Sequence, residues 1–172
     1  MTRIAPISLE HATDATRPLL EGVQKKIGFL PNVFGVLANA PVALTSYLQI
    51  SATLAKTSLS ATEKEAVFLA TSQVNGCDYC VAAHTFFADK VGLSQEDILS
   101  ARHGELNAIA ALARQITESR GHLSAEQLAA ARAAGIDDAK IIEVIAHVAS
   151  QTLTNYLNNA ALTDIDFPVI EA

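Results

Sequence analysis

The sequence predicts an all-α fold in a single domain, and three observations lead to this prediction. No alternation of apolar and polar residues persists long enough to indicate a sheet. Apolar residues make up 50% of the 172 residues, and most of the β-branched ones sit within helical periodicities. Capping patterns begin several of the apolar segments, and glycines end most of them. The length is sufficient for one domain with a hydrophobic core.

The expected helices follow from these start and stop patterns in chain order. Their ranges are 21–26, 42–54, 61–74, 78–90, 95–102, 106–120, 125–134 and 138–157. Three of them begin with a capping box, in which a serine is followed three residues later by an acid or amide: Ser60 with Glu63, Ser94 with Asp97, and Ser124 with Gln127. The expected helix ends lie at Gly76, Gly92, Gly104, Gly121 and Gly135.

We expect one domain over residues 1–172, with its chemical core at about 40–105. The tripeptide Leu-Ser-Ala begins at Leu59 and again at Leu123, and each copy opens a predicted helix. This repetition suggests a possible internal duplication in which only the first copy carries cysteines.

The composition and charge exclude several classes of protein. The formal net charge of −6 argues against a nucleic-acid-binding surface. No run approaches the roughly 18 apolar residues of a membrane span, and residues 1–18 lack a continuous hydrophobic segment typical of a secretory signal. We therefore expect a cytoplasmic protein, no membrane association and no nucleic-acid partner. In that compartment a close cysteine pair is more often catalytic or metal-binding than a structural disulfide.

The most informative segment contains both cysteines of the chain, Cys77 and Cys80, with His84 one helical turn later. At about 100° per residue, these three side chains fall within an arc of roughly 60° on the helix expected over 78–90. Cys77 would lie at the edge of that helix and Cys80 in its first turn, where unpaired N–H groups favour an anion. Because the thiolate is the nucleophilic form, the sequence predicts a reactive Cys80.

Glu65 lies at the margin of the apolar stripe of the helix expected over 61–74. A hairpin at Asn75 and Gly76 would fold this helix back onto the cysteine-bearing helix. Glu65 could then approach His84 and the two sulfur atoms.

The spacing of Glu65, Cys77, Cys80 and His84 resembles the signature of the AhpD-like alkylhydroperoxidases within the carboxymuconolactone decarboxylase family. The segments 28–34 and 40–41, with 123–126, 155–158 and 166–168, resemble its peroxidase-related branch. The resemblance implies an all-helical, cofactor-free, two-cysteine peroxidase or thiol-disulfide oxidoreductase with an antioxidant role. Its substrates would be organic or hydrogen peroxide, and its reductant an external dithiol: lipoyl, thioredoxin-like or glutathione.

The same resemblance implies a role for each residue of the motif. Cys80 corresponds to the cysteine that attacks the peroxide and becomes a sulfenic acid. Cys77 corresponds to the proton donor and resolving cysteine, and Glu65 and His84 correspond to the proton relay. Tyr79 stands where members of the family can carry a second relay histidine. A phenol, with a pKa of about 10, is no base near neutral pH, but it can donate a hydrogen bond.

Other interpretations of these residues remain open. Free cysteines are often small buried hydrophobic residues, and Cys77, Cys80, His84 and Glu65 could together bind a metal, although structural zinc sites usually include a second cysteine pair. A non-catalytic redox sensor is one alternative function. A decarboxylase of the family's namesake type is another, although such an enzyme needs no C-x-x-C pair.

We also expect a homo-oligomer, a trimer or a hexamer, with the number three implied by the resemblance. Val144, Val148 and Leu153 of the last helix offer apolar surface for such contacts. The alternating segment 164–170 is expected to lie across a neighbouring helix or subunit. His147 lies among apolar residues and is interpreted as an interior or interface residue rather than a catalyst.

Overall fold

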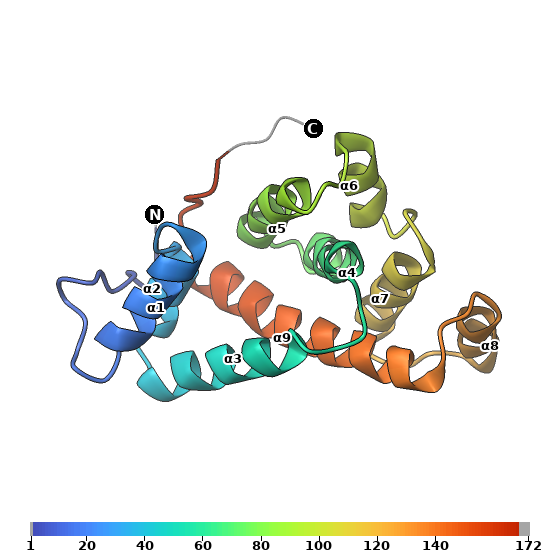
Figure 1. Ribbon diagram of the computed structural model, residues 1–172, viewed down its shortest axis with the longest axis horizontal. Coiled ribbons are helices and arrows are strands. Elements are labelled where there is room, and N and C mark those ends of the chain that lie inside the picture. Colours follow the sequence, from blue (N-terminus) through green and yellow to red (C-terminus); the bar gives the residue numbers. More distant parts are fainter. Residues whose placement is uncertain (1, 169–172) are drawn as a thin grey trace.

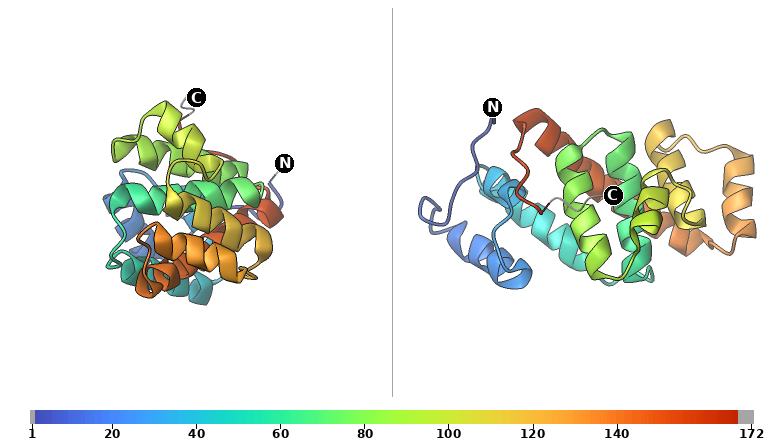
Figure 2. Two further views of the ribbon diagram at one scale, coloured as in Figure 1. Left: turned by 90° about the vertical axis from the view of Figure 1, so that its right-hand side faces the viewer. Right: turned by 90° about the horizontal axis from the view of Figure 1, so that it is seen from above.

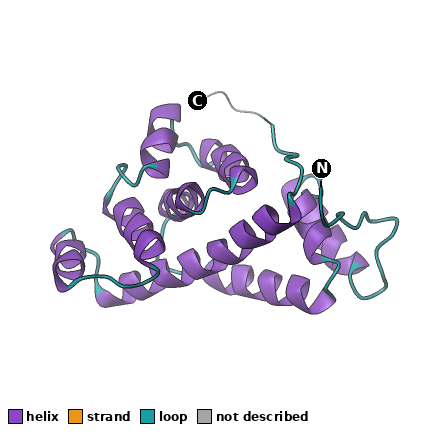
Figure 3. Ribbon diagram, turned by 180° about the vertical axis from the view of Figure 1, so that it is seen from behind, coloured by secondary structure: helices purple, strands orange, loops and turns teal. Residues whose placement is uncertain are grey.

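The computed structural model describes residues 2–168, and this part of the chain forms nine α-helices and no strand (Figures 1 and 3). The all-α prediction is therefore confirmed. The helices are α1 (Arg17–Ile27), α2 (Asn32–Leu37), α3 (Pro41–Leu54), α4 (Ala61–Val74), α5 (Asp78–Lys90), α6 (Gln95–Arg102), α7 (Ala108–Ser119), α8 (Ala125–Ala133) and α9 (Asp138–Ala161). Helices α1 and α2 lie at one end of the molecule and α8 at the other, and α9 spans most of the distance between them (Figures 1 and 2).

Helix α4 is the central element of the fold. Figure 1 shows it end-on, and α5, α6, α7 and α9 all contact it. Ala66 and Leu69 pack against α5, α6 and α7, whereas Val67 and Ala70 face α7 and α9. All four side chains are completely buried. Because the helix is covered on several sides, any polar group on its remaining face must find a partner inside the protein.

The helix boundaries agree closely with the sequence wherever capping chemistry defines them. The predicted ranges 61–74, 78–90 and 95–102 match α4, α5 and α6. All three predicted capping boxes are present, at Ser60, Ser94 and Ser124. The five glycines expected at helix ends adopt positive φ angles, which L side chains disfavour.

Three differences from the prediction are larger than two residues, whereas the other helix bounds differ by two residues at most. Helix α1 begins at Arg17 instead of 21, because Pro18 fits the first turn of a helix, where its missing N–H is not needed. Helix α2 was not predicted, and its first N–H, on Asn32, donates to the carboxylate of Asp166 from the far end of the chain (2.7 Å). Helix α9 continues to Ala161, four residues beyond the predicted end, because tertiary contacts outweigh the low helix propensity of its asparagines.

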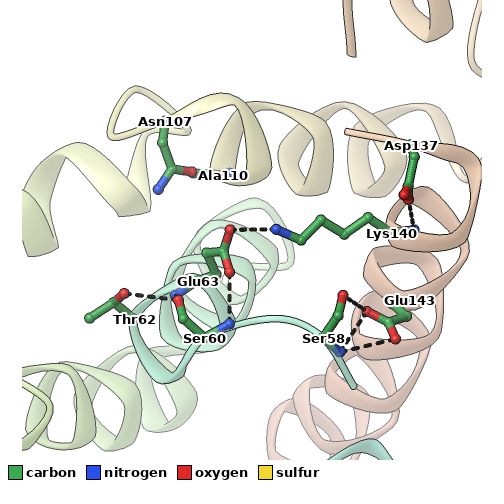
Figure 4. Close-up of polar contacts among 9 residues, drawn as sticks. All are labelled: Ser58, Ser60, Thr62, Glu63, Asn107, Ala110, Asp137, Lys140 and Glu143. Atoms are coloured by element: carbon green, nitrogen blue, oxygen red, sulfur yellow. Dashed lines mark hydrogen bonds and ion pairs between the residues drawn. The ribbon is translucent and has the colours of Figure 1, made fainter. Parts of the chain in front are cut away.

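Polar contacts fix α9 against the start of α4 (Figure 4). The ammonium of Lys140 lies 3.0 Å from the Glu63 carboxylate, and the Glu143 carboxylate accepts bonds from the backbone N–H and the hydroxyl of Ser58 (2.9 and 2.6 Å). These contacts set the position of α9 along α4. They therefore determine which residues of α9 reach the interior face of α4.

The C-terminal segment lies across its own chain. Residues 164–168 cross α2 and α5, and Phe167 is buried against Phe29, Phe86 and Phe87. The expectation for this segment is confirmed up to residue 168, whereas Val169 and Ile170 lie outside the described residues.

Of the three α9 residues that were expected to offer apolar surface for oligomer contacts, two are not at the surface. Val144 and Val148 are buried inside the protein, because they face α4 and α7. Leu153 is exposed, together with Ile142, Ile145 and Tyr156 on the same helix. None of the helices formed by residues 2–168 has the length and apolar character needed to cross a membrane.

Two helix-interior glycines give a matched test of the packing. A Cβ at Gly35 would meet Pro6 Cβ at 2.7 Å and the carbonyl oxygen of Ile7 at 2.9 Å, whereas a Cβ at Gly22 meets nothing within 4 Å. We expect Gly35→Ala to lower the free energy of unfolding by about 1–3 kcal/mol through overpacking. Gly22→Ala should raise it by about 0.5–1 kcal/mol, since alanine favours helix. Urea denaturation of both variants tests this, and a stabilised Gly35→Ala protein would contradict the close approach.

Candidate active site

Both cysteines lie where the sequence places them. Cys77 is the N-cap residue of α5, and Cys80 lies in the first turn of that helix. The α4–α5 connection is a tight hairpin in which Gly76 has a φ of 60° and the N–H of Cys77 donates to the carbonyl of Ser72 (3.0 Å). Both thiols are free and buried. Both cysteines therefore lie at the N-terminal end of α5, where the positive end of the helix dipole favours an anion.

The two thiols differ in their acidity. A hydrogen bond from Cys77 is the largest cause that lowers the pKa of Cys80, to about 6. Burial opposes this shift in the pKa, but the charge of His84 and hydrogen bonds from Asn158 and Asn155 add to it. The pKa of Cys77 is raised, because its thiol proton is shared with Cys80 and the site is buried. Cys80 is therefore the sulfur that carries negative charge near neutral pH, which is the order that the sequence predicts.

Glu65 and His84 meet between α4 and α5. The carboxylate oxygen of Glu65 lies 2.8 Å from Nδ1 of His84, and both side chains are largely buried. Burial by itself lowers the pKa of His84, but the charge and hydrogen bond of Glu65, with contributions from Cys80 and Gln151, outweigh it and raise that pKa. The hairpin thus brings Glu65 into the direct contact with His84 that the sequence left open.

The other ring nitrogen of His84 contacts α9. Nε2 lies 3.1 Å from Oε1 of Gln151, whose own amide nitrogen donates to the hydroxyl of Ser72 (2.9 Å). Asn155 donates to the same hydroxyl (3.1 Å). Since the amide nitrogen of Gln151 is already used, its oxygen accepts a proton from Nε2. With a carboxylate at Nδ1 and an amide oxygen at Nε2, both ring nitrogens donate, which stabilises His84 as an imidazolium.

Residues of α9 that the sequence analysis did not identify complete the site. Asn158 donates to the sulfur of Cys80 (3.3 Å), and Gln151 and Asn155 form the polar network beside it. All three are buried. Their spacing places them on one face of a helix. Amide side chains in a row on the interior face of an otherwise apolar helix are therefore the sequence pattern that could have identified them. Asn158 also lies beyond the predicted end of that helix.

The hydroxyl of Tyr79 serves the C-terminal segment. It donates to the carboxylate of Asp166 (2.8 Å) and accepts from the backbone N–H of Val33 (3.2 Å). Burial is the main cause that raises the pKa of Tyr79 further above its ordinary value. The expected hydrogen bond exists, and it connects α5 to α2 and to the C-terminal segment. Tyr79 otherwise packs with Phe167 and the cysteines.

Two cavities lie beside the sulfur of Cys80 and the Glu65–His84 ion pair. The smaller, about 80 Å³, is lined by Cys80, His84 and Asn158, and Cys77 is not among its lining residues. The larger, about 430 Å³, is enclosed by α1, α3, α4, α5 and α9 and is lined by Glu65, His84 and Gln151 among apolar side chains. Ile27, Phe34, Tyr47, His84 and Phe87 line both. A molecule in the larger cavity therefore lies next to the ion pair and close to Cys80.

The described part of the chain contains no group of three or more His, Cys, Asp and Glu side chains arranged to hold a metal ion. The donor atoms of the candidate site contact one another instead. Nδ1 of His84 bonds Glu65, and the sulfur of Cys80 accepts from Asn158.

Residues 41–115 match the Carboxymuconolactone decarboxylase family. An alkylhydroperoxidase AhpD core, an uncharacterized peroxidase-related protein from Ralstonia eutropha, is similar in structure at 23% identity, with a TM-score of 0.84 over 96% of this chain and 92% of that one. The debrominase Bmp8 in complex with 2,3,4-tribromopyrrole is similar at 21% identity, with a TM-score of 0.79 over 96% and 92%. The comparison with curated proteins found no match. The predicted resemblance to the AhpD-like fold is confirmed.

The acidity of Cys80 can be tested by alkylation. In a Cys77→Ser protein, which keeps a hydrogen-bond donor, the rate of reaction with iodoacetamide should rise with pH to a midpoint near 6. In Cys77→Ala the main cause of the lowered pKa is lost, so the midpoint should move up toward the ordinary thiol value of about 8.5. A midpoint near that ordinary value in both variants would contradict the proposed order of acidity.

The amide of Gln151 should control the charge of His84. Gln151→Leu removes the acceptor at Nε2, so the pKa of His84 should fall and that of Cys80 should rise. Gln151→Glu places a second carboxylate there, and the pKa of His84 should rise instead. NMR titration of the imidazole ring in both variants measures these opposite shifts. Equal titration curves would mean that Gln151 does not act on His84.

Proposed function

The chain has an AhpD-like fold and matches the carboxymuconolactone decarboxylase family over residues 41–115, and from this premise we propose that it is a cofactor-free, two-cysteine peroxidase. One observation carries the proposal. Cys80 has a lowered pKa and lines a cavity, while the protonated Cys77 and the Glu65–His84 pair lie beside it. A thiolate next to a thiol and an imidazolium suits the two-electron reduction of a peroxide.

In the first step the Cys80 thiolate attacks the terminal oxygen of an organic hydroperoxide. The S–O bond forms as the O–O bond breaks, so the sulfur is oxidised to a sulfenic acid and the substrate is reduced to an alkoxide. The imidazolium of His84 supplies the proton that converts the alkoxide into an alcohol. Its raised pKa keeps that proton in place until charge develops on the leaving oxygen.

In the second step Cys77 attacks the sulfur of the sulfenic acid. The Cys77 proton passes to the neutral His84, and the departing hydroxide takes it up as water. The S–S bond closes without an added reactant, since Cys77 lies within hydrogen-bonding reach of Cys80. An external dithiol, lipoyl, thioredoxin-like or glutathione, then reduces the disulfide by two electrons and restores both thiols.

Glu65 acts through His84 in this scheme. Its carboxylate holds the imidazole ring by Nδ1, and its charge favours the protonated form that the first step consumes. After the alcohol leaves, the same carboxylate favours reprotonation of the ring. Glu65 is therefore a positioning residue for the proton, and His84 is the group that transfers it.

Three other activities compete with this proposal. A redox sensor would form the disulfide without turnover, and a decarboxylase would act without any change of the thiols. The structurally similar debrominase suggests a third, in which a sulfur would act on a halogenated substrate. The predictions of a trimer or hexamer and of a cytoplasmic location stay predictions.

His84→Ala should fold normally and lose about 10²-fold or more of the peroxidase turnover, as expected when the general acid is removed. Glu65→Gln should also fold normally and lose about as much, because His84 then lacks the charge that keeps it protonated. Glu118→Gln is the matched control, because Glu118 is a partly exposed carboxylate on α7. The assay follows cumene hydroperoxide consumption with lipoyl, thioredoxin or glutathione as the reductant.

The outcome distinguishes the alternatives. If the wild-type protein forms the disulfide but shows no turnover with any of the three reductants, the result supports a sensor and contradicts the proposal. Bromide release from a bromopyrrole without hydroperoxide turnover would instead favour debromination. Unchanged turnover in Glu65→Gln or His84→Ala would remove that residue from the mechanism.

A further inference from the structure

One face of α3 forms a wall along the whole larger cavity. The residues at this end of α3 and just beyond it that line the cavity recur at helical spacing: Tyr47, Leu48, Ser51, Leu54 and Ala55. At a rise of 1.5 Å per residue, Tyr47 and Ala55 are separated by roughly 12 Å along the helix axis. Tyr47 also lines the smaller cavity beside Cys80, whereas Ala55 is exposed. The larger cavity therefore runs from the neighbourhood of the reactive sulfur to the protein surface.

Lys64 on α4 lies at the outer end of this cavity. Its ammonium donates to the carbonyl oxygen of Ala55 (2.9 Å) at a solvent-exposed position, and both residues line the cavity. The carbonyl uses one of the three N–H donors of the ammonium. None of the carboxylates of residues 2–168 forms an ion pair with Lys64. Two donors and an unmatched charge are thus available to a ligand at the mouth.

The charges on the cavity wall favour an anion. Lys26 of α1 lines the same cavity and adds a second positive charge. Among the described residues that line it, Glu65 is the one acid, and its charge is matched by the imidazolium of His84. The wall is therefore positive, although the chain as a whole has a formal net charge of −6. A local excess of this kind in a cleft attracts a ligand of the opposite charge.

We propose that the larger cavity binds an aliphatic carboxylate, with its chain along the apolar face of α3 and its carboxylate accepting hydrogen bonds from Lys64 at the mouth. The orientation follows from the charges, because the thiolate of Cys80 repels an anion at the inner end while Lys64 attracts one at the outer end. At the exposed mouth the carboxylate keeps part of its hydration, so the cost of burying a charge is avoided.

The site also defines a substrate class, a step that rests on the peroxidase function proposed above. The end of the chain opposite the carboxylate lies toward His84 and Cys80. The peroxidase would therefore prefer hydroperoxides of aliphatic carboxylic acids, with the O–O bond remote from the carboxylate.

Binding of two matched probes to the reduced wild-type protein tests the site without any turnover. Octanoate and octanamide share the chain and the carbonyl oxygen but differ in charge. NMR titration at pH 7 should give octanoate about 5- to 10-fold tighter binding, since a hydrogen bond between opposite charges is stronger than one to a neutral amide. Equal affinities of the two probes, or binding of neither, would overturn the proposal.

Variants of two neighbouring lysines assign the preference to Lys64. Lys64→Met, which keeps the apolar stem, should lower the octanoate affinity to about that of octanamide, whereas Lys64→Arg should retain most of the preference. Lys56→Met is the matched control, because Lys56 follows Ala55 and is exposed but does not line the cavity. Thermal melts of all three variants check the fold. A preference that survives in Lys64→Met, or that Lys56→Met removes equally, would contradict the site.

The hydroperoxide assay on the wild-type protein separates this proposal from the function on which its substrate class rests. A preference for octanoate that depends on Lys64, in a protein that consumes no hydroperoxide, would refute the peroxidase and keep the carboxylate site. Turnover of cumene hydroperoxide without any preference for octanoate would refute the carboxylate site and keep the peroxidase.

Discussion

A buried charge must be matched inside the protein, and the imidazolium of His84 is the group to which this applies most strongly here. It lies between the Glu65 carboxylate on α4 and the Gln151 amide oxygen on α9, and its own helix is α5. Leaving either partner out would expose an uncompensated donor in a region that little water reaches. Three helices must therefore meet at one ring, and the hairpin between α4 and α5 and the polar contacts near Lys140 keep them there.

The amide network extends this constraint to the sulfur atoms. Ser72 accepts from both Gln151 and Asn155, so the amide of Gln151 can turn only its oxygen toward His84. Asn158 continues the same face of α9 and donates to Cys80. The negative sulfur, the positive ring and the negative carboxylate thus alternate in sign. Each charge stabilises its neighbour, which is why the pKa of Cys80 is lowered while that of His84 is raised.

The two cysteines differ in position as well as in charge. Both sulfurs lie at the start of α5, but only Cys80 lines the small cavity, and only Cys80 accepts from Asn158. Cys77, at the N-cap, keeps its proton and lies against the neighbouring sulfur. The accessible sulfur is thus also the ionised one. Beyond it, the larger cavity offers mostly apolar walls next to the Glu65–His84 pair.

The sequence by itself determined the features that depend on neighbours in the chain. Capping serines and left-handed glycines act within one turn, so the bounds of α4, α5 and α6 and the placement of Cys77 and Cys80 at a helix start could be predicted. The spacing from Cys80 to His84 likewise fixes two side chains on one helix face. The two-residue hairpin at Asn75 and Gly76 allowed Glu65 to approach His84, but only the structure shows that the two side chains meet.

Only the tertiary structure decided what depends on distant segments. Helix α2 begins where Asp166 accepts from Asn32, and α9 extends to Ala161 because buried amides find partners on α4 and α5. These contacts join residues at least 67 positions apart, and local helix propensity does not predict them. For the same reason, the sequence analysis did not identify Gln151, Asn155 and Asn158 as residues of the site. It also reversed the expectation for Val144 and Val148, since which face of a helix is buried depends on the helices that pack against it.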